Sequence, residues 1–474
     1  MSQTHSGYRG LPVLAGLCSM EDAQRSDWSL AESVDRLKHL HYLLLRLHEI
    51  FTARITAEPI YELKTAFSHH AYLCAEHVTA IRKRVGEMRE PPLGLERIPH
   101  AGLEQYFEEI QAAPQTEDLV YGLYHHAIPA TLRVAERLFE DAHPLADSPT
   151  RRVMKFLIPE LKEIHEFGKS ACACLLSEDD FTRMAPWEKI LDECLLAAGH
   201  ADGTGSSRDQ LPSRMYSATP YQYDAVPRRD ERFLDSFNAG FNAEAFLYDE
   251  SFLPRDKVLA MYYKRIRELD VPEMMASILH EIRDEPWEFY EEMSRQLWDE
   301  ARHAMMGEVG FVRLGLDWRE IPINFTWSRN LNTQLTARER HGVLFYIEQG
   351  LMPKTGKRFE WEVGQASGDP FSALVQDFDW ADEVLHSQIG RRWYVPKYAS
   401  LHDALNYGDA CWSKVLSHWR EDREQGRTWH ENWWPTLYRK ACERWGVSPD
   451  PNALAFSETY EEIRADLKDI SASG

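Results

Sequence analysis

Two pairs of side chains in this sequence have the residue types and the spacing of metal ligands. Glu300 and His303 lie in the run WDEARH, and Glu383 and His386 lie in the run ADEVLH. Residues three apart lie on one face of an α-helix, about one turn from each other, so each pair presents a carboxylate beside an imidazole. A single pair arises by chance in charged helices, but its recurrence predicts a shared metal site.

The first pair lies in a predicted helical hairpin. The run DEP at 284–286 interrupts a long helical pattern, and its proline suits the first turn of the next helix. Helices rise about 1.5 Å per residue, so residues equally far from a turn lie at the same height. This places Glu273 opposite Glu300 and His303. His280 lies two turns along the same face as Glu273. We predict that it contacts the metal ligands without binding the metal itself.

A second hairpin repeats the arrangement. ARERHGVLFYIEQGL forms its first helix, the run GDP at 368–370 forms the turn, and the helix with the second pair follows. Glu348 lies within an apolar run and is the predicted single carboxylate, with His341 two turns before it on the same face. Glu360 and Glu362 are nearer the turn, but a proline and a glycine at 353 and 356 disturb the helix geometry there.

An aspartate precedes the glutamate of each pair. Asp299 and Asp382 each lie four residues before the histidine of their own pair, one turn away on the same side. We predict that each accepts the Nδ1 proton of that histidine and orients its ring. The alternative for each aspartate is a solvated charge on a helix surface.

Carboxylates can bridge two metal ions, and imidazole suits iron, manganese and zinc. Burying such groups without metal would cost on the order of several kcal/mol. One Glu, Glu-x-x-His, one Glu and Glu-x-x-His is the ligand set of di-iron and di-manganese helix bundles. The predicted metal ligands are Glu273, Glu300, His303, Glu348, Glu383 and His386.

On these motifs, residues 236–400 resemble the ferritin-like superfamily of di-iron carboxylate proteins. They look closest to a bacterial branch in which Asp-Glu-x-x-His occurs twice. The resemblance implies a four-helix bundle that holds two iron ions, with manganese as the alternative metal. It specifies metal binding more closely than it specifies the reaction.

Length, charge and cysteine content bound the protein class. With 474 residues the chain is too long for one compact core, so two or three domains are expected. The formal net charge of -22 argues against binding to nucleic acid or to an anionic membrane surface. Seven cysteines without a Cys-x-x-Cys run fit reduced thiols in a cytoplasm, and the N-terminus has no signal-peptide pattern. We therefore predict a cytoplasmic protein without a membrane span.

Helical periodicity dominates the chain, so the predicted fold class is mostly α. We expect an N-terminal helical domain over 1–198, a linker or covering loop over 199–232, the ferritin-like bundle over 233–400, and an aromatic-rich helical extension over 401–474. The N-terminal domain carries a polar stripe of Glu62, His69 and Glu76. The stripe is a second metal site, a surface that contributes to the first site, or a set of satisfied polar groups where helices meet, and we favour the last interpretation.

Two function classes follow from the resemblance. The first is a di-iron oxygenase or oxidase that activates O2 to oxidise a small organic substrate. The second is a ferroxidase, a peroxide scavenger or an iron-binding ferritin-like protein, and a scaffold with a vestigial site is a third. More than half of the chain lies outside the bundle, which favours an enzyme that encloses a substrate. The expected partners are a small-molecule substrate, O2 and an external electron donor, and a homodimer is allowed for.

Overall fold

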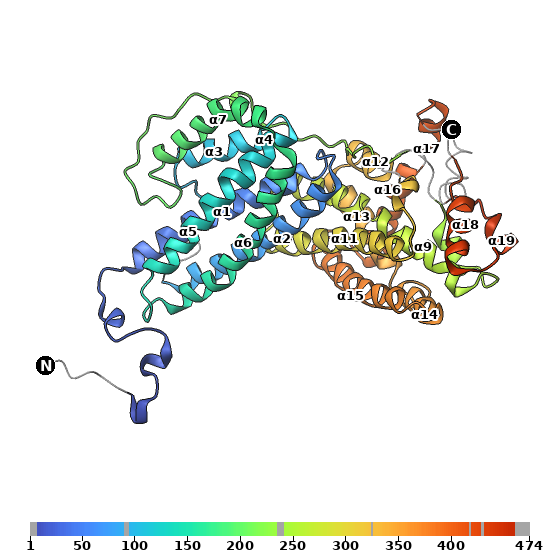
Figure 1. The fold of residues 1–474 in the computed structure, drawn as a ribbon, viewed down its shortest axis with the longest axis horizontal. Helices are drawn as coiled ribbons and strands as arrows, with labels where there is room; N and C mark the ends of the chain where they lie inside the picture. Colours follow the sequence, from blue (N-terminus) through green and yellow to red (C-terminus); the bar gives the residue numbers. More distant parts are fainter. Residues whose placement is uncertain are drawn as a thin grey trace. The chain divides into compact units, whose positions relative to one another are not determined.

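The computed structural model describes residues 7–89, 94–234, 241–323, 326–416, 419–427 and 431–459. The chain is mostly α-helical, which confirms the predicted fold class (Figure 1). Over the described residues, the β pairing is an isolated bridge between Phe241 and Thr459. Within the same ranges, no helix has both the length and the apolar character that crossing a bilayer requires.

The chain divides into two compact units. The first unit contains Met1–Phe51 and Leu73–Tyr223, and the second contains Thr52–Tyr72 and Asp224–Gly474. Most of the predicted loop at 199–232 therefore belongs with the first unit. The described parts of the C-terminal extension belong with the second unit, as does a short N-terminal segment at 52–72. The ends of α1 and α2 that adjoin this segment are counted with the second unit.

Helices account for most of the first unit. In it α5 packs against α6, and α3 packs against α7. A π-helical segment lies between α4 and α5, and the described part of 199–223 contains only one short 3-10 turn. The elements are α1 (Leu30–Arg54), α2 (Tyr61–Glu87), α3 (Ala101–Gln111), α4 (Thr116–Val120), the π segment (Tyr121–Ala127), α5 (Ile128–Asp141), α6 (Ser148–Leu175), α7 (Glu178–Ala197) and the turn Tyr216–Ala218.

The second unit holds both Glu-x-x-His pairs. Its helices are α8 (Ala243–Tyr248), α9 (Pro254–Arg267), α10 (Asp270–Glu281), α11 (Trp287–Arg313), α12 (Thr326–Gln334), α13 (Ala337–Gly350), α14 (Lys357–Ala366), α15 (Pro370–Trp393), α16 (Leu401–Leu416), α17 (Trp419–Glu424), α18 (Trp434–Trp445) and α19 (Pro451–Leu454).

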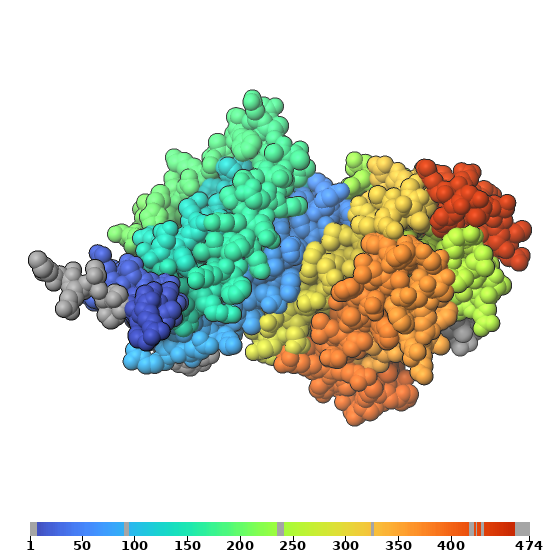
Figure 2. All heavy atoms as spheres, turned by 60° about the horizontal axis from the view of Figure 1, so that its bottom comes forward, coloured from blue at the N-terminus to red at the C-terminus, as the bar shows by residue number. Residues whose placement is uncertain are grey.

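The two helices that carry the pairs pack against each other. α11 contacts α9, α10 and α15, while α13 contacts α10, α15 and α16. Figures 1 and 2 show α11 in yellow beside α15 in orange. This bundle-like arrangement turns the pairs of α11 and α15 toward a common interior, where both glutamates and both histidines are buried.

Glycine allows α9 and α11 to approach closely. A Cβ atom at Gly307 would lie 2.3 Å from the backbone nitrogen of Ile266, and one at Gly310 would lie 2.4 Å from Cδ1 of Tyr262. Carbon atoms normally approach no closer than about 3.5 Å. The spacing of these helices therefore depends on the absence of side chains at 307 and 310.

The helix boundaries follow the predicted turn signals in the first hairpin and depart from them in the second. α10 ends at Glu281, and α11 begins directly after Pro286. In the second hairpin α14 lies between α13 and α15, so the turn at 368–370 joins α14 to α15 instead of α13 to α15. Asp369 starts α15 by accepting a hydrogen bond from the Phe371 amide at 3.1 Å.

Candidate metal centre

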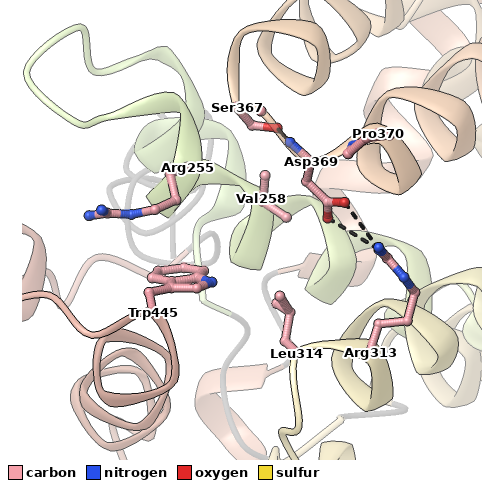
Figure 3. A pocket seen from close by; sticks show the side chains of 9 residues that line it. Arg255, Val258, Arg313, Leu314, Ser367, Asp369, Pro370 and Trp445 are labelled. Carbon is pink, nitrogen blue, oxygen red and sulfur yellow. Dashed lines mark hydrogen bonds and ion pairs between the residues drawn. The ribbon is translucent and has the colours of Figure 1, made fainter.

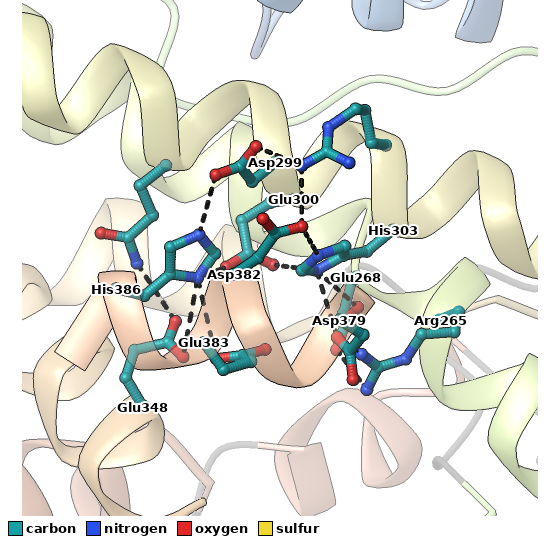
Figure 4. A network of polar contacts seen from close by, with 12 residues as sticks. Arg265, Glu268, Asp299, Glu300, His303, Glu348, Asp379, Asp382, Glu383 and His386 are labelled. Atoms are coloured by element: carbon teal, nitrogen blue, oxygen red, sulfur yellow. Dashed lines mark hydrogen bonds and ion pairs between the residues drawn. The ribbon is translucent and has the colours of Figure 1, made fainter. Parts of the chain in front are cut away.

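Two groups of potential ligands converge in the interior of the second unit. The first, called the Glu348 group, contains Glu300, Glu348, Glu383 and His386. The second, called the Glu268 group, contains Glu268, His303, Asp379 and Glu383. In each group, one potential ligand atom from every residue lies within 4.8 Å of the others, and Glu383 belongs to both groups. Figure 4 shows these carboxylates turned toward the two imidazole rings.

Four elements position these residues. Glu268 caps the C-terminal end of α9, and Glu348 lies in the last turn of α13. The pairs on α11 and α15 project from the faces on which these helices meet. α15 adds Asp379, one turn before Glu383. The arrangement supplies single carboxylates from two helices and Glu-x-x-His from two others.

Glu300 faces both histidines. Its Oε1 lies 3.1 Å from His386 Nδ1, and its Oε2 lies 3.6 Å from His303 Nδ1. His386 Nδ1 also lies 3.7 Å from Glu383 Oε2 and 4.0 Å from Glu348 Oε2. Glu300 and Glu383 thus reach across the centre, whereas Glu268 and Glu348 lie at its ends.

Several of the converging atoms lack a hydrogen-bond partner although they are buried. His386 Nδ1 and Glu300 Oε1 lie within ion-pair distance of each other, but neither atom has a hydrogen-bond partner among the described residues. Buried polar atoms are nearly always satisfied, so such a set in one place calls for an additional partner. A metal ion would satisfy them together, and the residues present fit one. The atoms are Glu268 Oε2, Glu300 Oε1, Glu348 Oε2, Glu383 Oε2, His303 Nδ1 and His386 Nδ1.

Each aspartate contacts the histidine of the other pair. His303 Nε2 donates to Asp382 Oδ2 at 3.2 Å, and His386 Nε2 donates to Asp299 Oδ2 at 3.4 Å. This corrects the prediction that each aspartate binds Nδ1 of the histidine in its own pair. The contacts cross between α11 and α15 because these helices pack against each other. They leave Nδ1 of each ring directed at the carboxylates.

Arginines hold the two aspartates in place. Arg302 pairs with both of them, and its Nη2 lies 2.7 Å from Asp382 Oδ2. Arg295 Nε donates to Asp299 Oδ1 at 2.9 Å. Charged hydrogen bonds of this kind fix the orientation of the carboxylates, and the carboxylates in turn fix the rings.

The crowding of charge shifts the pKa values of the histidines upward. Burial alone would lower the pKa of His303, but Asp382, Glu268 and Glu300 outweigh burial and raise it to about 10. Burial also opposes the charged form of His386, yet Asp299, Glu300 and Glu383 raise its pKa well above the usual value. Without metal, the charged form of both rings is therefore favoured, and it partly balances the carboxylates.

The pKa values of Glu348 and Glu383 are shifted in opposite directions. Burial and the neighbouring carboxylates of Glu383 and Glu300 raise the pKa of Glu348 well above its usual value. Burial would also raise the pKa of Glu383, but Lys357, Glu348 and His386 lower it well below its usual value. Like charges this close together oppose one another's ionisation, so the protonated form of Glu348 is favoured when no metal is bound.

Five of the six predicted ligands lie in the two groups, whereas Glu273 lies elsewhere. Its carboxylate is fully buried between Lys64 Nζ, 2.7 Å from Oε1, and Arg229 Nη2, 3.0 Å from Oε2. Equal distance from a turn fixes the height of a residue but not the helix face on which it lies, and Glu273 lies on the face of α10 that contacts Lys64, Arg229 and Ser328. Glu268, which follows α9, supplies the single carboxylate instead.

The predicted supporting histidines also lie outside the groups. His280 lies at the end of α10 beside Arg283, and burial lowers its pKa to about 4. His341 packs among aromatic rings, 5.8 Å from the ring of Phe289 and 5.4 Å from that of Tyr394. Glu360, considered as an alternative to Glu348, pairs with Lys264 instead.

Four residues of the centre escaped sequence reasoning. Asp379 had a usable signal, since it lies four residues before Glu383 and therefore on the same helix face. Glu268 had none, because its position depends on where α9 ends. Arg265 and Lys357 are basic residues in charged runs, and both are fully buried against the Glu268 group.

The N-terminal polar stripe has ordinary partners. Both carboxylate oxygens of Glu62 accept from Arg232 at 2.6 Å, and the ring of His69 lies 4.4 Å from that of Trp298. Neither described ligand group includes a residue of the stripe. These contacts favour the structural interpretation of the stripe.

A pocket adjoins the centre. Its volume is about 130 Å³, and its polar floor includes Glu300 and Glu348. Its walls are mainly apolar, and Trp327 and Trp412 meet edge to face there at 5.0 Å. The pocket provides a place for a small molecule next to the ligand atoms.

A larger pocket of about 500 Å³ lies elsewhere in the second unit (Figure 3). Its charged groups are already paired: Arg313 Nη1 lies 3.1 Å from Asp369 Oδ1, and the Arg255 guanidinium lies 5.1 Å from the centre of the Trp445 ring. Its lining includes no residue of either ligand group.

Comparison with known proteins adds no assignment: no family model, no curated protein and no solved structure matches this chain.

Proposed function

We propose that this protein is a ferritin-like di-iron oxidoreductase that uses O2 to oxidise a small organic substrate, with manganese as the alternative metal. The observation that carries the proposal is the convergence of two Glu-x-x-His pairs with two single glutamates, Glu268 and Glu348, in a buried interior. Mixed carboxylate and imidazole ligands suit iron and manganese. When bound, two such ions would supply the electrons that reduce O2.

The residues of the chain prepare the site in three ways. Asp382 and Asp299 hold the Nε2 protons of His303 and His386, so that Nδ1 of each ring stays directed inward. Glu300 spans the two rings and suits a bridging role. Glu348 holds a proton that it can release when a cation arrives, because its pKa is raised by burial and like charge.

The adjoining pocket supports a small substrate. Typical pockets for drug-sized ligands have volumes of about 300–1,000 Å³, and this one is smaller at about 130 Å³. Its lining combines apolar side chains such as Trp327, Leu331 and Trp412 with charged ones, among them Glu300 and Glu348. A substrate of this kind would be mainly apolar and would lie directly against the ligands.

The test is anaerobic loading with Fe(II), followed by a pulse of O2, with absorbance and oxygen uptake recorded. We expect one oxidation, stoichiometric with the bound metal, that stops until a reductant is added. Continued oxidation of excess Fe(II) with mineral formation would instead assign an iron-storage role. Consumption of peroxide that far outpaces consumption of O2 would assign a defence role.

A further inference from the structure

The two ligand groups differ in the charged side chains that surround them. Arg265 Nη2 lies 2.8 Å from Glu268 Oε1, and the same guanidinium pairs with Asp379. Lys357 Nζ lies 2.9 Å from Asp379 Oδ2 and 2.8 Å from Glu383 Oε1. Two fully buried cations thus engage the three carboxylates of the Glu268 group.

In the Glu348 group the ion pair of Lys357 with the shared Glu383 is present, but within the described ranges Glu300 and Glu348 themselves have no such ion pair. Among the described residues, no lysine or arginine lies within ion-pair distance of either carboxylate. The neutral amide of Gln296 donates to Glu348 Oε1 at 3.2 Å. Gln296 precedes Glu300 by four residues, just as Asp379 precedes Glu383. The repeated motif therefore carries a neutral amide in one copy, and an acid bound by two cations in the other.

We propose that the two metal positions are unequal, and that the first ion binds tightly in the Glu348 group while the second binds weakly in the Glu268 group. The inference rests on the proposed dinuclear function and specifies how that site is filled. A second ion must share Asp379 and Glu383 with Lys357, or displace its ammonium group. It also meets the repulsion of two fixed positive charges in a medium that screens them poorly.

The net charge of the centre predicts the same order in which the two metal positions are filled. Once metal binding has displaced the protons of Glu348, His303 and His386, the five carboxylates of the two groups, with Arg265 and Lys357, carry a net charge of minus three. One divalent ion leaves a charge of minus one, whereas a second changes it to plus one. The first ion therefore enters a site of favourable charge, and occupancy of the second position follows the available metal concentration.

Anaerobic titration with Mn(II), followed by calorimetry and electron paramagnetic resonance, tests the inference without any turnover. We expect the first equivalent to give the spectrum of isolated ions. The second should bind at least about tenfold more weakly and change the spectrum to that of coupled pairs. Equal affinities, or coupled pairs already at low occupancy, would overturn the inference but leave the dinuclear function standing. A chain that binds neither Mn(II), Fe(II) nor Zn(II) would overturn the proposed function itself.

A matched pair of variants identifies which group fills first. Glu268→Gln and Glu348→Gln each replace one terminal carboxylate by an amide of the same size. Glu268→Gln should retain the tight ion and lose the weak one, whereas Glu348→Gln should lose the tight ion. The reverse result would overturn the proposed order.

Lys357→Met tests the cause of the inequality. We expect the second ion to bind about tenfold more tightly, or better, because its competitor for Asp379 and Glu383 is gone. Lys64→Met is the control, since Lys64 is equally buried but pairs with Glu273 away from both groups. Unchanged affinity in a folded Lys357→Met variant would contradict the role of the lysine. If that variant does not fold, the glutamine pair still decides the order.

Discussion

Replacing Gly307 by alanine tests whether close packing of α9 on α11 positions Glu268. The added Cβ would lie 2.3 Å from Ile266 N and 2.7 Å from Tyr262 O. Both are backbone atoms that cannot rotate away, so the helices must separate by about 1 Å to restore ordinary contact. Overpacking of this kind costs about 1–3 kcal/mol. Because Glu268 follows Ile266 by two residues, the shift also moves it from His303, whose Nδ1 lies 3.4 Å from Glu268 Oε2.

We therefore expect two results for Gly307→Ala. The free energy of unfolding should be lower by about 1–3 kcal/mol. The protein should also bind the second metal ion more weakly, while its affinity for the first ion stays unchanged. Urea denaturation of the metal-free protein measures the former, and Mn(II) titration measures the latter. Gly86→Ala is the control, since a Cβ there meets nothing within 4 Å in helix α2. That change should leave the free energy of unfolding the same or slightly higher, because Gly86 is the last residue but one of α2. If Gly307→Ala is as stable as Gly86→Ala, the helix contact does not set the position of Glu268.

Three further outcomes are expected. Glu383→Ala should lower metal content in elemental analysis because Glu383 belongs to both groups, whereas Glu62→Ala should leave it unchanged; equal loss from both would place a metal site in the N-terminal stripe. Asp382→Asn should weaken metal binding by about 10–100-fold in a competition titration, because the amide holds the His303 ring less well; unchanged affinity would show that the ring needs no such support. The pKa of His303 is about 10 without metal, so at pH 7 a metal ion must displace its proton. Metal uptake should therefore release protons into a weakly buffered solution, and apparent affinity should rise from pH 7 toward pH 10; an affinity independent of pH would contradict a protonated ring.

Sequence reasoning located the parts of the centre that local spacing dictates. Glu300 and His303, like Glu383 and His386, are three residues apart, and a helix places them on one face whatever surrounds it. Glu348 was also found, because a single acid in an apolar helical run has few places to lie except the interior. In each case one helix and its periodicity carried the inference.

Residue positions that depend on how helices pack against each other are harder to predict from the sequence. The sequence predicts Glu273 as the single carboxylate of the first hairpin, whereas Glu268 lies there, because the height of a residue above a turn does not reveal which neighbouring element its helix face meets. The partners of Asp299 and Asp382 were exchanged, because spacing along one helix does not reveal that the opposite helix brings a closer ring. Both differences arise from packing between elements rather than from an error in the elements themselves.

The positions of the buried cations Lys357 and Arg265 also depend on packing between helices. The unequal charge around the two ligand groups is therefore difficult to predict from the sequence. The two Asp-Glu-x-x-His motifs have the same pattern and differ four residues before the glutamate, where one copy has Gln296 and the other has Asp379. Lys357 and Arg265 lie in charged runs that are typical of solvated helix surfaces. They become part of the centre only because the fold turns them toward Asp379, where burial without a carboxylate would be prohibitive. A repeated motif therefore predicts that two metal positions exist, while the surrounding charges decide whether they are filled together or in turn.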